Sequence, residues 1–174
     1  MSILKVARMG HPVLRATARA LERADFKSAA LQGLIDDMIE TMVEYRGVGL
    51  AAPQVHEELQ LFVAVLDADD DEAETEPVVV INPQITPVGT EIVDGWEGCL
   101  SVPDIRGRVP RAREIQLAAF DRRGERFELH LQDFPARVVQ HEADHLAGML
   151  FFDRMRSFES LTFLDEYSRY WVKD

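Results

Sequence analysis

The sequence predicts an α+β fold, with small mixed or antiparallel β-sheets around a central helix. Two observations support this: apolar residues recur at helical spacing in well-separated stretches, and short apolar strands lie between them. The chain has 174 residues, of which 47% are hydrophobic. This is enough to form one sizeable core, and we therefore expect a single domain over residues 1–174.

The first half of the chain predicts one helix and two strands. Residues 28–45 place apolar side chains at helical spacing, and Gly47 follows as a helix end. Short apolar runs at about 60–66 and at 77–82 predict strands on either side of an acidic stretch.

The second half predicts a hairpin and two further helices. Alternating segments flank Arg122-Arg123-Gly124, an arrangement typical of a β-hairpin. A helix is expected over about 134–148, with Gly148 as its end. A last helix is expected over 158–171, with its apolar side chains on Phe158, Leu161, Phe163, Leu164 and Tyr167.

The net charge of −12 comes largely from one segment. Residues 67–76 carry seven acidic groups and no basic one, which predicts a solvated loop between strands. A calcium-binding loop is the alternative, but the run lacks the central glycine and the closing glutamate of an EF-hand. The negative balance also argues against binding of nucleic acid, which requires Lys and Arg to neutralise phosphates.

Cysteine content and hydropathy indicate the compartment. Cys99 is the only cysteine, so the chain can form no disulfide within itself, which fits a reducing environment. No apolar run approaches the roughly 20 residues that span a bilayer, and the N-terminal residues lack the pattern of a secretory signal. We therefore expect a cytoplasmic protein with no membrane partner.

The segment QHEADHLAG at 140–148 contains the pattern H-E-x-x-H. On a helix, His141 and His145 lie about 40° apart on one face, so both imidazoles can bind one metal ion. Glu142 lies about 60° further round the helix than His145, close enough to accept or release a proton. This helix is the metal-binding helix that we place at the centre of the fold. Such short patterns also arise by chance on solvated helices, so the segment needs support from the rest of the chain.

Two further segments give that support. GVGLAAPQ at 47–54 allows a tight turn and close approach of the backbone to a ligand, although it also suits an ordinary connection. EGCLS at 97–101 holds Cys99, and a lone cysteine is most often a small buried apolar residue. If Cys99 joins His141 and His145, the set has three protein ligands and one open position, as in catalytic zinc sites.

These three segments, complete and in this order, resemble the signature motifs of peptide deformylase. The resemblance extends over roughly residues 5–155, including GHPVLR near the N-terminus and VPDIRGRVPR after the cysteine. It implies a metal-dependent hydrolase that removes the N-formyl group from the initiator methionine of nascent polypeptides and releases formate.

The resemblance also implies the role of each site residue. The metal would lower the pKa of its water, Glu142 would transfer protons, and the Gln54 amide and the Leu100 N–H would bind the developing oxyanion. The expected metal ligands are Cys99, His141 and His145. The expected substrate-binding residues are Val48, Phe134 and Val138 around the methionine side chain, Gly49 along the peptide backbone, and Arg106.

Some roles stay open from sequence alone. Arg106 contacts substrate or forms a surface ion pair, and Glu97 orients an imidazole or pairs with Arg111. Asp144 is expected to have a surface or structural role rather than to bind metal.

The resemblance favours Fe²⁺, one per chain, with Zn²⁺, Ni²⁺ or Co²⁺ as substitutes. The expected partner is an N-formylmethionyl peptide. Because the tail after Met155 is not basic, any association with the ribosome is expected to be weak and to use another surface.

Two other functions compete with deformylation. A zinc endopeptidase also uses H-E-x-x-H, although the cysteine ligand and the Gly-Leu-Ala-Ala-Gln-type loop argue against it. A non-catalytic relative that only binds peptides is the third hypothesis, and the presence of Glu142 and Gln54 argues against it.

Overall fold

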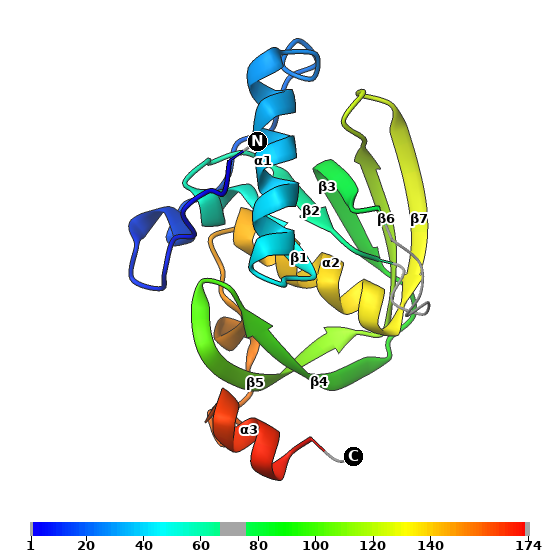
Figure 1. Ribbon diagram of the computed structural model, residues 1–174. Helices are drawn as coiled ribbons and strands as arrows, with labels where there is room; N and C mark the ends of the chain where they lie inside the picture. Colours follow the sequence, from blue (N-terminus) through cyan, green and yellow to red (C-terminus); the bar gives the residue numbers. More distant parts are fainter. Residues whose placement is uncertain (1, 67–75, 173–174) are drawn as a thin grey trace.

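The computed structural model describes residues 2–66 and 76–172. It has the predicted α+β architecture, in which a helix lies between antiparallel sheets (Figure 1). The acidic run at 67–75 lies outside the described residues, and so does the calcium-loop alternative. No described helix is long and apolar enough to cross a membrane. The expectation of a single domain stays a prediction.

The larger sheet has five strands in the order β1-β2-β3-β6-β7, and every neighbouring pair is antiparallel. Its strands are β1 (Gly49–Ala51), β2 (Leu61–Ala64), β3 (Val78–Pro87), β6 (Glu114–Phe120) and β7 (Arg126–Gln132). The predicted hairpin is confirmed, because β6 and β7 pair along their full lengths around the Arg122-Arg123-Gly124 turn. Gly124 has a φ of +81°, a conformation that favours glycine.

The smaller sheet consists of β4 (Ile92–Cys99), β5 (Val102–Ala112) and the short β8 (Thr162–Phe163), in the order β4-β5-β8. We did not predict β4 and β5 from sequence. Most of β4 is exposed or half-buried. Glycines interrupt β4, and a glycine and two prolines interrupt β5, so neither strand shows a clean alternation of apolar and polar residues. Their pairing with each other, across the turn at residues 100–101, provides the regularity that the sequence lacks.

Helix α1 (Ala29–Glu44) agrees with the predicted amphipathic helix. The Ser28 side chain caps it by accepting from the Leu31 N–H, and one face buries Ile35, Met38 and Met42. The described residues also form three short 3₁₀ helices: η1 (Pro12–Arg15), η2 (Ala52–Val55) and η3 (Phe151–Arg154).

Helix α2 (Asp133–Leu146) lies between the two sheets (Figure 1). Ala136, Val138 and Val139 pack in a hydrophobic cluster with strands of the five-stranded sheet. The turn that follows the helix ends at Gly148, which has a φ of +71°. A Cβ atom at this position would lie 2.6 Å from the Arg15 carbonyl oxygen. The helix end that the sequence predicts at Gly148 therefore depends on close backbone packing as well as on the backbone conformation of this glycine.

The last predicted helix is shorter than expected. Helix α3 covers only Leu164–Tyr170, and β8 precedes it. The prediction for 158–163 was wrong because its apolar residues do not form one buried stripe: Phe158 is 67% exposed and Phe163 is 65% exposed. Thr162 and Phe163 pair instead with the edge of β5.

Candidate metal centre and substrate cleft

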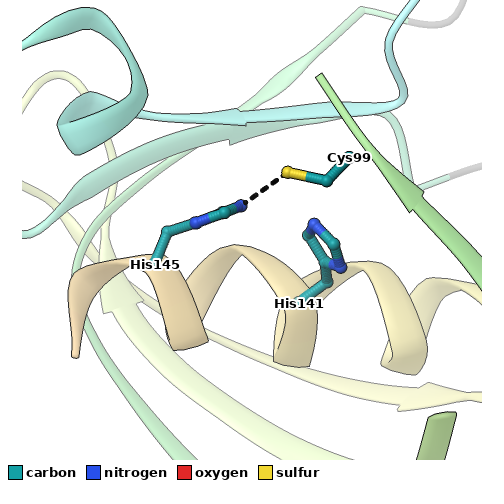
Figure 2. Close-up of side chains that lie close together, drawn as sticks. All are labelled: Cys99, His141 and His145. Atoms are coloured by element: carbon teal, nitrogen blue, oxygen red, sulfur yellow. Dashed lines mark hydrogen bonds between the residues drawn. The ribbon is translucent and has the colours of Figure 1, made fainter. Parts of the chain in front are cut away.

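Cys99, His141 and His145 converge between the smaller sheet and α2 (Figure 2). Their ligand atoms all lie within 4.8 Å of one another, and the Cys99 Sγ and His145 Nε2 atoms are 3.3 Å apart. Ligands around a tetrahedral ion with bonds of about 2.0–2.3 Å lie about 3.5 Å from each other. All three side chains are buried. The set therefore fits a metal ion in both spacing and chemistry.

Local backbone features bring Cys99 to α2. The register of β4 against β5 shifts between Glu97 and Cys99, and the chain turns back immediately after the cysteine. Gly98 lies at this irregularity, where a Cβ atom would come within 2.0 Å of Arg106 Nη1. Glycine leaves room here for the Arg106 guanidinium, which lies against the backbone beside the cysteine.

The electrostatics favour the thiolate form of Cys99. Burial by itself raises the pKa of the Cys99 thiol. The charges of His145 and His141 and their hydrogen bonds outweigh this effect and bring the pKa well below its usual value. Burial likewise lowers the pKa of His141, whereas hydrogen bonds with Cys99 and Glu97 raise it well above the usual value. Thiolate is the form of cysteine that binds metals.

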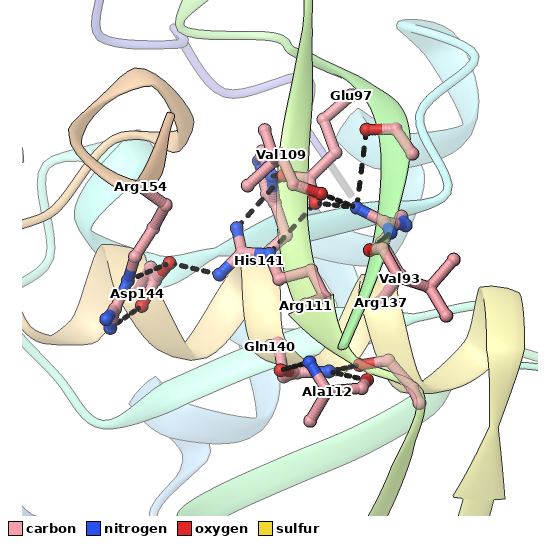
Figure 3. Close-up of polar contacts among 12 residues, drawn as sticks. Val93, Glu97, Val109, Arg111, Ala112, Arg137, Gln140, His141, Asp144 and Arg154 are labelled. Carbon is pink, nitrogen blue, oxygen red and sulfur yellow. Dashed lines mark hydrogen bonds and ion pairs between the residues drawn. The ribbon is translucent and has the colours of Figure 1, made fainter. Parts of the chain in front are cut away.

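Glu97 fixes the orientation of the His141 ring. His141 Nδ1 donates to Glu97 Oε2 at 2.9 Å, which leaves Nε2 for a metal (Figure 3). Burial raises the pKa of Glu97, but hydrogen bonds from Arg111 and His141 lower it to about 2. Glu97 is therefore a carboxylate at neutral pH. It both orients the His141 ring and pairs with Arg111, so the structure contains both of the roles left open for it.

Arg111 joins this carboxylate to a second one. Its Nε and Nη2 atoms each donate to Glu97 at 2.9 Å, and Nη1 donates to Asp144. Asp144 also accepts from Arg154 Nη2 at 2.8 Å. Asp144 is 6% exposed, so the structural part of its prediction is correct and the surface part is wrong. The Asp144 carboxylate faces Arg111 on β5 and Arg154 on η3, and not the metal ligands.

Glu142 lies at the floor of the cleft and is 4% exposed. Among the described residues, its Oε2 atom has no hydrogen-bond partner. Burial raises the pKa of this carboxyl, and the charges of His141 and His145 partly oppose the increase. Its neighbour is the backbone of Gly49, where a Cβ atom would come within 2.3 Å of Glu142 Oε1. A buried carboxylate with an uncommitted oxygen is suited to accept and release a proton.

The Gln54 amide lies beside the cysteine. Its Oε1 atom accepts from the Ala51 N–H at 2.8 Å, and its Nε2 atom donates to Ser101 Oγ at 3.2 Å and to Cys99 Sγ at 3.5 Å. The bond to Ala51 fixes which end of the amide is the donor, so the NH₂ group faces the metal centre. Leu100, the next residue after Cys99, also lines the cleft.

A cleft of about 520 Å³ opens above these residues. Ten of the eleven predicted site residues line it, and His145 lies behind it, 1% exposed. The ten are Val48, Gly49, Gln54, Cys99, Leu100, Arg106, Phe134, Val138, His141 and Glu142. Within the described chain, Arg106 makes no ion pair, and its Nη1 atom donates only to the Ile105 carbonyl. The described part of the chain therefore gives no support to the surface-ion-pair alternative for Arg106.

The sequence analysis missed several residues of the cleft, among them Arg137. Arg137 donates to Glu97 and Val109 at 2.8 Å and to the Val93 carbonyl at 2.7 Å. It precedes His141 by one helical turn, and this spacing was the one available signal. Trp96, Tyr45 and Leu164 also line the cleft, and no motif marks them.

Comparison with known proteins agrees with this geometry. The family model of polypeptide deformylase matches residues 3–160. Peptide deformylase 1 of Bordetella pertussis is 46% identical over 154 residues, covering 87% of this chain and 86% of the relative. Peptide deformylase 2 of a Nostoc species is 42% identical over 175 residues, covering 99% and 97%.

A solved structure extends the agreement to the fold. The crystal structure of the class I type b peptide deformylase from Acinetobacter baumannii with Met-Ala-Ser bound is 41% identical, with a TM-score of 0.82. The match covers 89% of this chain and all of the other. On this evidence the chain belongs to the peptide deformylase family, the metal-dependent hydrolases that remove the N-formyl group from the initiator methionine of nascent polypeptides.

Proposed function

We propose that this chain hydrolyses N-formylmethionyl peptides at the centre formed by Cys99, His141 and His145. The observation that carries the proposal is the convergence of these three ligands beside Glu142 and Gln54 at the floor of one cleft. A bound metal ion would supply Lewis acidity, which activates water and polarises the formyl carbonyl.

Glu142 is the proposed proton carrier. It takes a proton from the attacking water and returns it to the leaving amine. Its burial supports this role, because a carboxylate with a raised pKa holds the proton more firmly between the two transfers. The uncommitted Oε2 atom supports it as well.

The Gln54 amide and the Leu100 backbone N–H are the proposed donors to the oxygen of the formyl group. This oxygen gains negative charge as its carbon becomes tetrahedral, and donors held in place beforehand stabilise that charge. The bond from Ala51 to Gln54 Oε1 supports the assignment, since it holds the NH₂ group toward the cleft before substrate arrives.

Val48, Phe134 and Val138 are proposed to surround the methionine side chain. Val138 is buried, whereas Val48 and Phe134 are 48% and 46% exposed, so a bound methionine would cover apolar surface. The backbone at Gly49, on the edge strand β1, is proposed to pair with the extended peptide. Arg106 is proposed to contact the peptide downstream of the methionine.

We infer that the physiological metal is Fe²⁺, with Zn²⁺, Ni²⁺ and Co²⁺ as substitutes. One thiolate and two imidazoles suit all four ions, and the family assignment favours iron. We also infer that the enzyme acts in the cytoplasm, where a single free cysteine stays reduced. We still predict that any association with the ribosome is weak.

The proposal is tested by formate release from formyl-Met-Ala-Ser. We expect turnover by freshly isolated protein, a loss of at least about 10²-fold in kcat for Glu142→Gln, and metal retention by that variant. Elemental analysis of the same samples identifies the metal. Glu125→Gln is the matched control, because Glu125 is an exposed carboxylate in the β6–β7 turn, and it should keep the full rate.

The competing activities give different results. An endopeptidase would cleave an internal peptide with a free N-terminus, which we expect to remain intact. A peptide-binding protein without catalysis would release no formate from any substrate. Formate release that Glu142→Gln leaves unchanged would refute the assigned proton transfer.

A further inference from the structure

The C-terminal segment, defined here as residues 161–172, lies beyond the part of the chain that the family model matches, which ends at residue 160. In the structure this segment nevertheless reaches the substrate cleft. Its Leu164 side chain, at the start of α3, is half-buried and lines the cleft together with Trp96, Gly98 and Arg106. Figure 1 shows α3 lying against the β4–β5 hairpin.

The segment is held in this place by contacts along its length. Thr162 and Phe163 pair with Arg106 and Ile105 at the edge of β5. The Trp96 ring packs against Tyr167 at a centroid distance of 4.9 Å and against Trp171 at 5.5 Å. These contacts fix Leu164 relative to β4 and β5, the strands that also carry Cys99 and Arg106.

We propose that Leu164 and Trp96 form a subsite for an apolar side chain of the substrate, downstream of the formylmethionine. This inference rests on the proposed deformylase function and adds a specificity to it. The chemistry follows from the residues that line this part of the cleft: Leu164 presents a branched alkyl group and Trp96 an aromatic ring, while the planar Arg106 guanidinium lies against Gly98. A leucine or phenylalanine side chain placed there buries apolar area on both sides.

The peptide direction supports the same assignment. The methionine side chain is proposed to lie at Val138 and Phe134, and the scissile formyl group at Cys99. Later residues of the substrate then extend along the rest of the cleft, whose lining includes Arg106 and Leu164. The C-terminal segment is thus a wall for the second to fourth residues of the nascent chain, and not only a cover for the smaller sheet.

A leucine scan tests the subsite. In the reference formyl-Met-Ala-Ser-Ala, leucine replaces the second, third or fourth residue in turn, and kcat/KM is measured for each peptide. At one position we expect leucine to raise kcat/KM about 3- to 10-fold over the reference, mainly through KM. In Leu164→Ala this advantage should fall to less than about 2-fold. Leu161→Ala, in the same segment but outside the cleft, should keep the advantage.

Intrinsic fluorescence provides a readout that does not depend on activity. The chain has two tryptophans, Trp96 and Trp171, and in the structure the ring of Trp171 in the C-terminal segment packs against that of Trp96. Titration with the product peptide that carries leucine at the favoured position should change their emission. Its dissociation constant should be about 3- to 10-fold lower than that of Met-Ala-Ser-Ala.

The outcomes separate the subsite from the function itself. No hydrolysis of the reference peptide would refute the proposed deformylase activity. Hydrolysis with no leucine advantage at any position would overturn the subsite alone. The same holds for an advantage that Leu164→Ala retains, and for competitive product binding that leaves tryptophan emission unchanged. The wild-type titration keeps the test decisive even if Leu164→Ala does not fold.

Discussion

Gly49 is the residue at which β1, the strand proposed to pair with the substrate, contacts the candidate proton carrier Glu142. A Cβ atom at this position would lie 2.3 Å from Glu142 Oε1 and 2.7 Å from Cδ, well inside van der Waals contact. The glycine has no positive φ, so the constraint is the space beside Glu142 and not backbone conformation. The second glycine of the GVGL segment is therefore explained by a carboxylate that lies 93 residues later in the printed sequence.

We expect Gly49→Ala to reduce kcat by about 10²-fold, because the added methyl group displaces the Glu142 carboxylate from its working position. Overpacking of this kind also typically costs about 1–3 kcal/mol of stability. Deformylation kinetics and urea denaturation measure the two effects.

Gly33→Ala is the matched control for this substitution. Gly33 lies inside α1, and a Cβ atom there would meet nothing within 4 Å. It should raise stability by about 0.5–1 kcal/mol, because alanine favours helix over glycine, and leave activity unchanged. Full activity of Gly49→Ala would mean that Glu142 moves without consequence, contrary to its proposed role.

Among the secondary-structure elements, buried ion pairs join β4, β5 and α2, and Arg154 of η3, which is 47% exposed, extends this network to the surface. Glu97 comes from β4, Arg111 from β5, Asp144 from α2 and Arg154 from η3. Because Glu97 also holds His141, this network connects the packing of the smaller sheet to the geometry of a metal ligand. Arg137 adds bonds to backbone carbonyls of both strands.

Arg111→Met should lower the free energy of unfolding by about 3–5 kcal/mol, because it leaves two buried carboxylates without their shared cation. Denaturation by urea measures the change. Arg113→Met, two residues further along the chain, is the control. Arg113 pairs with Glu91 and Asp133 on the surface, where all three side chains are about half-exposed. Its unfolding midpoint should hardly move, since exposed ion pairs contribute little. Equal losses in the two variants would contradict the structural role of the buried network.

Prediction of the elements from sequence succeeded where apolar spacing was regular. Helix α1 and the β6–β7 hairpin show clean periodicity, and the structure has both close to the predicted bounds. The β4–β5 hairpin was missed because its strands are stabilised by each other and by α2 rather than by a regular apolar pattern. The C-terminal helix was placed too early because Phe158 and Phe163 are exposed instead of buried.

For the whole molecule, the candidate metal centre links two separate layers. Cys99 comes from the smaller sheet, whereas His141 and His145 come from α2, which packs on the five-stranded sheet. An ion bound by all three binds the folded chain and not the unfolded one, so it adds to stability by mass action. At a free metal concentration of about 100 times the dissociation constant, this gain is about 2.7 kcal/mol.

Removal of the metal by a chelator should therefore lower the melting temperature by about 5–10 °C, and adding the metal back should restore it. Differential scanning calorimetry with elemental analysis of each sample measures this change. Cys99→Ala should lack a chelator-dependent shift, because only two ligands remain. A melting temperature that stays constant while the bound metal is lost would show that these side chains do not couple metal binding to folding.

The amino-acid sequence was sufficient to establish the local chemistry of the candidate site. Two imidazoles and a carboxylate within five residues of a helix have their relative directions set by helical geometry, so the H-E-x-x-H segment could be interpreted without coordinates. Their association with Cys99 and Gln54 rested on resemblance to a family, because spacing along a chain does not encode contact between distant segments.

The surroundings of that chemistry depend on the packing of the folded chain. It brought Cys99 within 3.3 Å of a ring 46 residues away, and it joined Glu97 to both His141 and Arg111. It also brought Leu164 into the cleft. The reason is physical: periodicity reports which face of an element is buried, whereas the partner of each buried polar group depends on how the elements pack.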